Sequence, residues 1–376
     1  MKYLILILLA SSVACLFSDD FYQILAKENA KVNLITSPLS VEIVMSMMYM
    51  AAGGETAEEL RNTLELPEDK KELANNYWKC FSNFKAREKS IVLRLANRIY
   101  INKNYSLIPE FNQLVQYSFK AKAKKIRLDD PNEAASIINN WVNNKTRGKI
   151  RYIVSPSDMS SDLSAIVVNA IYFQGQWKYQ FRADQTHQAD FYVSSEKNIP
   201  VEMMTMSERL FSAYLNDLGA KVIELPYRKS NLSMRIFLPN TIDGLSILEE
   251  KIVGFSRDLQ KNYVDVKLPK FKIEFSAKLK AVLQQLGIRE AFESSADFSG
   301  LALESSVEID NVVQKAFLKV DENGTEASAA TKVLVRRKKS VSFRHPMEFI
   351  ADHPFAYTIH DKDKIYFQGH IVKPEW

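Results

Sequence analysis

The sequence predicts an α+β fold in one large domain. Two observations carry this prediction: helix signals gather in the first half of the chain, and the second half is mostly strands. A third is that no linker, charge block or repeat divides the 376 residues. With 46% hydrophobic residues, a chain of this length can bury a substantial core.

Four stretches carry helix signals, namely an N-cap residue, a proline in the first turn, helical spacing or a terminal glycine. They are residues 39–52, opened by Ser37-Pro38; a stretch opened by a capping box at Thr56–Glu59; residues 131–148, opened by Asp130; and residues 277–286, ended by Gly287.

Strand signals dominate the rest of the chain. Residues 163–173 are nearly all apolar, as expected of a strand buried on both faces. Shorter strands are predicted at 222–225, 232–238, 263–268 and 316–320, and a closing hairpin at 355–359 and 365–372.

The N-terminus is interpreted as a signal peptide, residues 1–15, followed by a single domain over 16–376. Lys2 precedes an apolar run too short to span a bilayer, and small residues follow it. Cleavage is expected at Ala14 or Cys15. We therefore expect a secreted, extracellular monomer without a membrane span. If Cys15 is removed, Cys80 is the one thiol left, and no internal disulfide can form.

Charge and motif content argue against several classes of function. The formal charge of +5 is too small for a nucleic-acid-binding surface. Glycine spacing excludes the nucleophile elbow and the dinucleotide and phosphate loops, and the His residues lack metal-ligand spacing. We expect no enzyme, no cofactor and no metal.

Residues 325–336 carry the most unusual pattern. Odd positions from Thr325 to Val335 are small or β-branched, and even positions are mostly polar. This is the period of a strand with one buried face. The pattern ends in the basic run 336–339, which suits a protease with an acidic specificity pocket. An ordinary strand followed by a solvated basic turn would look the same, so the residues alone leave both interpretations open.

Ordered motifs along the chain resemble those of serpins, a family of serine protease inhibitors. Residues 322–331, Glu-Asn-Gly-Thr-Glu-Ala-Ser-Ala-Ala-Thr, are similar to the hinge of inhibitory serpins. The other matching segments are residues 33–40, 139–150, 168–177, 200–204, 224–227, 268–271, 296–300 and 352–355. They span essentially the whole mature chain, and extracellular insect serpins are the most similar.

The resemblance implies the serpin fold, with three β-sheets, about nine helices and an exposed reactive-centre loop at about 322–342. It also implies suicide-substrate inhibition, in which the cut loop inserts into the large sheet while the protease stays bound as an acyl-enzyme. Family spacing places the bait at Lys338, with the bond to Lys339 cut; Arg337 or Lys339 is the alternative bait after a one-residue shift. Trypsin-like serine proteases are the expected partners, and a furin-like convertase would want Arg as bait.

The resemblance assigns roles to two groups of residues. The hinge comprises Glu322, Gly324, Thr325, Ala327 and Ala329, and the sheet-opening region comprises Ser37, Ser40, Asn169, Gln314, Trp177 and Lys270. Gln314 stands where the family usually has His, so we expect the hydrogen-bond network to persist without protonation-dependent behaviour. Lys270 and Glu322 are expected to form an ion pair that restrains premature opening.

Two alternatives remain open. The first is a non-inhibitory serpin that acts as a carrier or storage protein; such hinges tend to hold bulky residues or Pro, which residues 325–330 lack. The second is a protein that binds a heparin-like glycosaminoglycan. Its candidate residues are Lys120, Lys122, Lys124, Lys125 and Arg127, although such a run is also typical of a solvated strand face.

Four sequons for N-glycosylation occur in the sequence. Asn104, Asn144 and Asn231 are predicted acceptors. Asn323 shares the odd parity of Thr325, so a glycan there could not follow the strand into a sheet. We expect Asn323 to be empty, which glycopeptide mapping would test.

Overall fold

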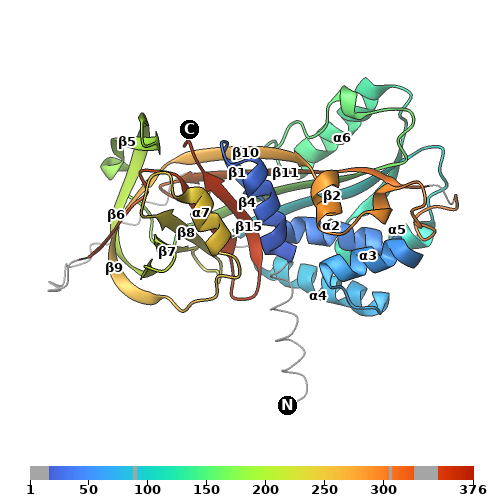
Figure 1. Cartoon of the computed structure of the whole chain (residues 1–376). Coiled ribbons are helices and arrows are strands. Elements are labelled where there is room, and N and C mark those ends of the chain that lie inside the picture. The colour runs from blue at the N-terminus through green and yellow to red at the C-terminus, as the bar shows by residue number, and fades with distance from the viewer. Residues whose placement is uncertain (1–16, 88–90, 305–306, 326–345) are drawn as a thin grey trace, which may run out of the picture.

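The computed structural model describes residues 17–87, 91–304, 307–325 and 346–376 (Figure 1). Its strands are β1 Leu34–Thr36, β2 Ile91–Asn102, β3 Lys122–Ile126, β4 Ala165–Gln176, β5 His187–Ser194, β6 Lys197–Leu215, β7 Ala220–Pro226, β8 Ser233–Pro239, β9 Gln260–Pro269, β10 Phe271–Lys278, β11 Ile309–Asp321, β12 Gly324–Thr325, β13 Met347–Ile350, β14 Phe355–His360 and β15 Ile365–Ile371. The strands predicted near 163–173, 222–225, 232–238, 263–268 and 316–320, and the closing hairpin, are confirmed by β4, β7, β8, β9, β11 and the β14–β15 pair.

The described strands form two sheets. A six-stranded sheet has the order β10-β11-β12-β4-β2-β3, and a nine-stranded sheet has the order β1-β15-β14-β8-β7-β6-β9-β13, with β5 paired to β6. The resemblance implies three sheets. The difference arises because β6 is 19 residues long: its first part pairs with β5 and its last part with β7, so one strand joins what would otherwise be separate sheets.

The described chain contains eight α-helical segments, close to the expected nine. They are residues 17–28, α2 Pro38–Ala51, α3 Gly54–Leu64, α4 Lys70–Arg87, α5 Pro109–Phe119, α6 Pro131–Lys145, α7 Leu245–Lys251 and α8 Lys280–Gln285, with 3-10 turns η1 Pro156–Asp158, η2 Ala183–Gln185 and η3 Glu290–Phe292. In this described part, no helix is both long and apolar enough to cross a membrane.

Two of the predicted helix starts are confirmed by their caps. The Ser37 hydroxyl accepts from the backbone N–H of Ser40 at the start of α2. The Asp130 carboxylate accepts from the N–H groups of Asn132 and Glu133 at the start of α6. Each cap satisfies donors that have no partner within the helix, which fixes where the helix begins.

Two other helix predictions are wrong in part. Thr56 does not cap α3, because that helix already begins at Gly54; Thr56 is buried inside it, and its hydroxyl accepts from the N–H of Asp297. The late helix begins at Lys280, not at residue 277. Ala277 still belongs to β10, where it pairs with Gln314 of β11, and strand pairing therefore overrides the helical spacing there.

Strand β4 lies between two hydrophobic cores. Its odd residues Ala165, Val167, Ile171 and Phe173 face the main core, whereas its even residues from Ile166 to Tyr172 face a second core beneath α6. Figure 1 shows α6 on one side of the six-stranded sheet, with α2 to α5 on the other. The prediction of a strand buried on both faces is confirmed.

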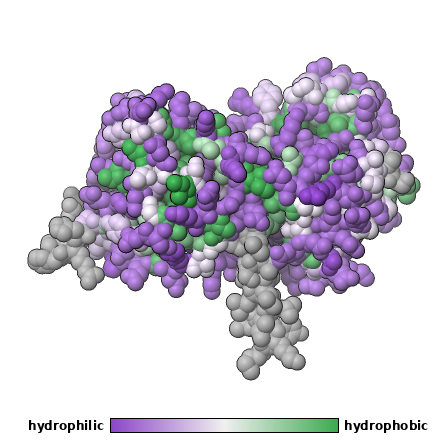
Figure 2. All heavy atoms as spheres, viewed as in Figure 1, coloured by the Kyte–Doolittle hydropathy of each residue, from purple (hydrophilic) through white to green (hydrophobic). Residues whose placement is uncertain are grey.

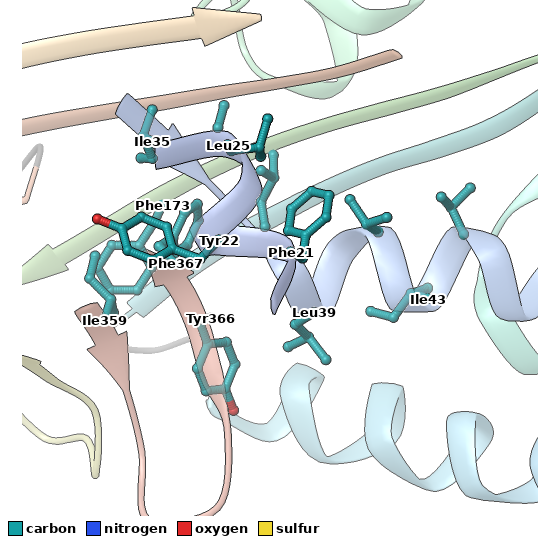
Figure 3. Close-up of a cluster of buried hydrophobic side chains, with 14 of the residues drawn as sticks. Phe21, Tyr22, Leu25, Ile35, Leu39, Ile43, Phe173, Ile359, Tyr366 and Phe367 are labelled. Atoms are coloured by element: carbon teal, nitrogen blue, oxygen red, sulfur yellow. The ribbon is translucent and has the colours of Figure 1, made fainter. Parts of the chain in front are cut away.

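The main core continues from β4 into the N-terminal helix, α2 and the β14–β15 hairpin. Figure 3 shows Tyr22 near Phe173 and Phe367, with Phe21 and Leu39 elsewhere in the same buried cluster. The Phe173 and Phe367 ring centroids are 5.8 Å apart, which joins the six-stranded sheet to the hairpin. On the face drawn in Figure 2, the surface is mainly hydrophilic, with hydrophobic residues in small patches between.

Candidate functional site at the hinge and the opening of the sheet

The hinge turn, which we define as residues 321–325, lies at one end of the six-stranded sheet. Strand β11 ends at Asp321, the chain turns, and β12 returns between β11 and β4. Gly324 lies opposite Asp321 on one side and Gln176 on the other. Two residues of the predicted loop therefore already lie between β11 and β4, which pair directly with each other from Ile309–Ala165 to Phe317–Tyr172.

Gly324 is required by the close approach of this turn to β4. Its φ of +151° is one that residues with a side chain rarely adopt, and a Cβ atom there would lie 2.1 Å from the carbonyl oxygen of Gly175. A side chain at Gly175 is also sterically excluded, since a Cβ atom there would lie 2.7 Å from the Tyr227 ring. The two glycines let the loop backbone and β4 meet without an intervening side chain.

Thr325 is fully buried, as the period-2 pattern predicts for an odd position. Its hydroxyl lies 2.7 Å from the phenol oxygen of Tyr227. Burial raises the pKa of Tyr227, so the phenol stays neutral and able to donate. Tyr227 stacks on Trp177 with ring centroids 4.7 Å apart, and Trp177 itself is buried.

Trp177 fixes the hinge turn through two hydrogen bonds. Its backbone N–H donates to the carbonyl of Asn323 at 3.0 Å, and its indole N–H donates to the carbonyl of Asp321, also at 3.0 Å. The N–H of Phe181 donates to the carbonyl of Glu322 at 3.0 Å. The segment that follows β4 therefore binds three successive carbonyls of the turn.

The side chain of Glu322 is bound from two directions. The Lys270 ammonium lies 3.3 Å from its carboxylate, and the Thr186 hydroxyl donates to the same oxygen at 2.9 Å. Burial opposes ionisation of this carboxyl. Hydrogen bonds from its own backbone and from Thr186, together with the Lys270 charge, nevertheless hold the pKa of Glu322 below its ordinary value. The structure thus brings the predicted ion pair together.

A polar cluster lies where β11 and β4 pair directly. Gln314 of β11 is opposite Asn169 of β4, and its amide N–H donates to the Asn169 oxygen at 2.8 Å. The Asn169 amide donates in turn to the Asn97 oxygen on β2 at 2.7 Å and to the Ser40 hydroxyl. A continuous series of side-chain hydrogen bonds therefore crosses the neighbouring strands β11, β4 and β2.

The start of α2 closes this cluster from the main-core side. Gln314 donates to the carbonyl of Ser37 at 3.0 Å and accepts from the Thr36 hydroxyl. The Ser37 hydroxyl donates to the carbonyl of Tyr366 at 2.6 Å. Every side chain in the cluster is an amide or a hydroxyl, and all are buried, so the network holds together without a titratable group.

Comparison with known proteins identifies the family of this fold and site. A family model described as Serpin (serine protease inhibitor) matches residues 13–374. The chain belongs to the serpin family. Serine protease inhibitor 42Dd of Drosophila melanogaster is 46% identical over 376 residues, with both chains fully covered.

Solved serpin structures have the same fold. Serpin48 of the insect Tenebrio molitor, described as highly specific, aligns with a TM-score of 0.90 at 33% identity over 97% of each chain. Cleaved Serpin 42Da aligns with a TM-score of 0.84 at 34% identity, covering 98% of this chain and 99% of that one. The serpin fold and the similarity to insect serpins are confirmed. The family description names inhibitors of serine proteases.

Four residues of this serpin's hinge region and polar cluster were missed by sequence reasoning. They are Thr36, Asn97, Thr186 and Tyr227, each hydrogen-bonded to a predicted site residue. Tyr227 ends the motif at 224–227 and Thr36 lies inside the motif at 33–40, so the serpin motifs already contained them. Asn97 and Thr186 lie outside any motif. Strand pairing places Asn97 in the polar cluster, and the hinge turn places Glu322 beside Thr186.

Several predicted residues of the loop cannot be placed. Ala327, Ala329, Arg337, Lys338 and Lys339 lie outside the described residues, as does the proposed signal peptide. Among the sequons, Asn104, Asn144 and Asn231 are exposed and Asn323 is half-buried. Their occupancy stays a prediction.

The basic run at 120–127 lies on and beside β3, the edge strand of the six-stranded sheet. Lys122, Lys124 and Lys125 are exposed, while Ala123 and Ile126 are buried. The Lys120 ammonium donates to the carbonyl of Tyr117 at 2.7 Å, and Arg127 lies 3.5 Å from Asp129. Exposed lysines on an edge strand prevent pairing with another chain, which accounts for the run without a ligand.

Proposed function

We propose that this serpin is a secreted inhibitor of trypsin-like serine proteases that traps its target by inserting residues 324–335 between β11 and β4. The hinge turn supplies the start of that strand, because Gly324 and Thr325 are already paired with both neighbours. The family and the hinge geometry support inhibition. The trypsin-like specificity rests on the basic run 336–339.

The register of β12 on β4 is the observation that carries the proposal. Gly324 pairs with Gln176 and Thr325 with Gly175, so residue numbers in a pair add to 500. Continued at the same register, the strand would bring Val335 opposite Ala165, the first residue of β4. The twelve residues of β4 are thus matched by residues 324–335, and the basic run begins immediately beyond the strand.

The same register explains the parity of the loop sequence. Directly opposed residues in an antiparallel pair place their side chains on the same face. Ala327, Ala329 and Val333 would lie opposite Phe173, Ile171 and Val167, which all face the main core. Thr331, the polar residue of the odd series after Thr325, would lie opposite Asn169 of the polar cluster. Apolar and polar positions therefore match on both strands.

The trapping step needs only the protease's own chemistry. Its serine attacks the carbonyl carbon of Lys338, the amide bond to Lys339 breaks, and Lys339 leaves with a free amino group. Lys338 remains joined to the serine as an ester. Insertion of the freed strand then carries the ester-linked protease away from its starting position before water can hydrolyse the ester. The polar cluster must rearrange on the way, because the Gln314–Asn169 hydrogen bond crosses the path of the strand.

The decisive experiment mixes the purified protein with trypsin and separates the products under denaturing conditions. We expect a stable complex of the two chains and a released C-terminal peptide that begins at Lys339. Mass spectrometry of that peptide locates the cut. Digestion of the loop with release of fully active trypsin would refute inhibition and favour the carrier or storage alternative.

Matched variants assign the bait residue. Lys338→Ala should abolish the trypsin complex, while Arg337→Ala and Lys339→Ala should keep it, because a trypsin-like pocket reads the residue before the cut. Loss of the complex in Arg337→Ala alone would move the bait to Arg337 and favour a furin-like convertase. Elution from heparin at rising salt tests the glycosaminoglycan alternative, with a Lys122→Ala/Lys124→Ala variant as comparison.

A further inference from the structure

The last residue of the sequence, Trp376, lies beside the hinge turn. The backbone N–H of Lys272 donates to the carbonyl of Glu375 at 2.7 Å, which fixes the end of the chain at β10. Figure 1 shows the C-terminal end of the chain close to β10. The Trp376 ring is about half exposed, with 55% of its surface accessible.

Two lysines lie against the Trp376 ring. The Lys270 ammonium is 4.2 Å from the ring centroid and the Lys319 ammonium is 4.5 Å from it. Both distances are within the range at which the electron-rich face of an indole attracts a cation. Lys270 comes from the link between β9 and β10, and Lys319 comes from β11, so the ring joins two segments that flank the hinge turn.

The same two lysines face the acidic residues of the hinge turn. Lys270 is the ion-pair partner of Glu322 at 3.3 Å, and Lys319 lies 3.8 Å from the carboxylate of Asp321. A free lysine side chain samples many rotamers, and that freedom weakens an exposed ion pair. An indole that holds the ammonium groups in place reduces the freedom and excludes water from one side of each cation.

We propose that Trp376 is a positioning residue for the hinge turn: by holding Lys270 and Lys319 against Glu322 and Asp321, it slows the spontaneous release of the hinge. The inference rests on the proposed function, because release of the hinge matters only if the loop inserts. It assigns a role in inhibition to a residue that lies in sequence outside both the hinge turn and the basic run.

The test compares Trp376→Ala with the native protein and with Trp376→Phe. Hydrogen exchange of the Gly324 and Thr325 amides, which lie in strand pairs, measures hinge release directly. Spontaneous loss of trypsin-trapping capacity on warming measures its consequence. We expect Trp376→Ala to speed both by about threefold, the scale of a half-exposed cation–π contact, and Trp376→Phe to restore most of the native rates.

The matched control is Tyr214→Ala. Tyr214 is 58% exposed and lies 5.9 Å from the Lys221 ammonium, so it has the same kind of contact in the nine-stranded sheet. This variant should leave both rates unchanged. A mutant cycle adds specificity: once Glu322→Gln and Asp321→Asn have together removed both acidic partners, Trp376→Ala should have little further effect.

The outcomes separate this inference from the proposed function. If the native protein fails to trap trypsin while Trp376→Ala still speeds amide exchange, the inhibitory function is wrong and the positioning role stands. If exchange at Gly324 and Thr325 is the same in Trp376→Ala, in Tyr214→Ala and in the native protein, the positioning role is overturned. An undiminished effect of Trp376→Ala in the Glu322→Gln/Asp321→Asn background would also overturn it.

Discussion

Strand β4 is paired on both of its sides, and the two pairings differ. On one side β2 runs antiparallel to it over eleven residue pairs without a register shift. On the other side β11 runs parallel to it over eight pairs, with a register shift between Ile309 and Asn311 and with β12 already inserted at one end. We call these the β2 pairing and the β11 pairing.

The difference is consistent with the proposal that the β11 pairing separates to admit the loop. Parallel pairs are slightly less stable per residue than antiparallel ones, and the inserted hinge leaves fewer backbone bonds between β11 and β4. One side-chain hydrogen bond of Asn169 crosses each pairing: the Asn169 amide N–H donates to Asn97 on β2, and the Asn169 oxygen accepts from Gln314 on β11. The crossing hydrogen bond is therefore chemically similar in the two pairings. The pairings differ in their backbone hydrogen bonds and in the presence of the hinge turn.

The largest expected effect comes from a charge at the end of the β11 pairing. Thr325→Arg should abolish trapping of trypsin, because a guanidinium would have to enter a position with no exposed surface. The fraction of trypsin held as complex should fall by more than about tenfold, as expected for a penalty above about 1.4 kcal/mol. Gel densitometry of the complex measures it.

The control for that substitution is Glu326→Arg, at an even position. It should leave most of the trapping intact, because the even face of the loop already carries polar and charged residues. Equal loss of trapping in both variants would contradict the assignment of the odd face to the core.

Cleavage of the loop should stabilise the whole protein if the β11 pairing opens to admit a strand. A full strand adds on the order of ten backbone hydrogen bonds, each contributing about 1 kcal/mol. The midpoint of thermal unfolding should then rise by at least about 10 °C. Calorimetry before and after limited cleavage near residues 337–340 checks this, and equal midpoints would mean that no strand is inserted.

Removing the side-chain hydrogen bond that crosses each pairing should distinguish the β2 pairing from the β11 pairing by its effect on trapping. Gln314→Leu and Asn97→Leu should both lower the free energy of unfolding by about 1–3 kcal/mol, because each leaves buried polar partners unsatisfied. Only Gln314→Leu should also speed spontaneous loss of trapping capacity, by several-fold, since its bond lies across the pairing that opens. Similar acceleration in Asn97→Leu would remove the distinction.

The smallest expected effect is an acid dependence of the hinge. Because the folded pKa of Glu322 is lowered, its ionised form stabilises the hinge above the ordinary Glu pKa of about 4.3, and this is lost as pH falls through the folded value. The carboxyl of Asp321 has the opposite pH dependence. Burial raises the pKa of Asp321, so its contribution to hinge stability is favourable at low pH and is lost as pH rises through the folded pKa.

In an Asp321→Asn variant, which removes the opposing carboxyl, amide exchange at Gly324 and Thr325, corrected for intrinsic rates, should accelerate in acid more than exchange in β7 of the same sample. Glu322→Gln should show the acceleration already at neutral pH. An acid response of equal size in Glu322→Gln would assign the effect to another group.

The sequence predicted much of this architecture because local signals and tertiary packing agree there. Ser37 and Asp130 cap their helices in the predicted way, and β4 is apolar because it has a core on each side. The prediction at Thr56 failed because a capping pattern also occurs inside a helix whose start is set by Gly53 and Gly54. Residue 277 was assigned to a helix because helical spacing continues into the preceding strand.

The site was predictable where a family motif covers it and unpredictable elsewhere. Ser37, Asn169 and Trp177 lie in motifs; the structure places the first two in the polar cluster and Trp177 at the hinge turn. Asn97 joins them only through the register of β2 on β4, and Trp376 reaches Lys270 only through the pairing of residue 375 with β10. Contacts between segments so distant in sequence leave no local pattern.

The twelve-residue length of β4 has a consequence for how such an inhibitor can change its target. If the strand continues at the register set by Gly324, the sheet would constrain residues 324–335 and end before Arg336. Substitutions from residue 336 onward would change which protease is captured without changing the strand that inserts. The bait residues and the inserting strand could then be mutated independently. Protease specificity could be changed by exchanging one short segment that begins at Arg336.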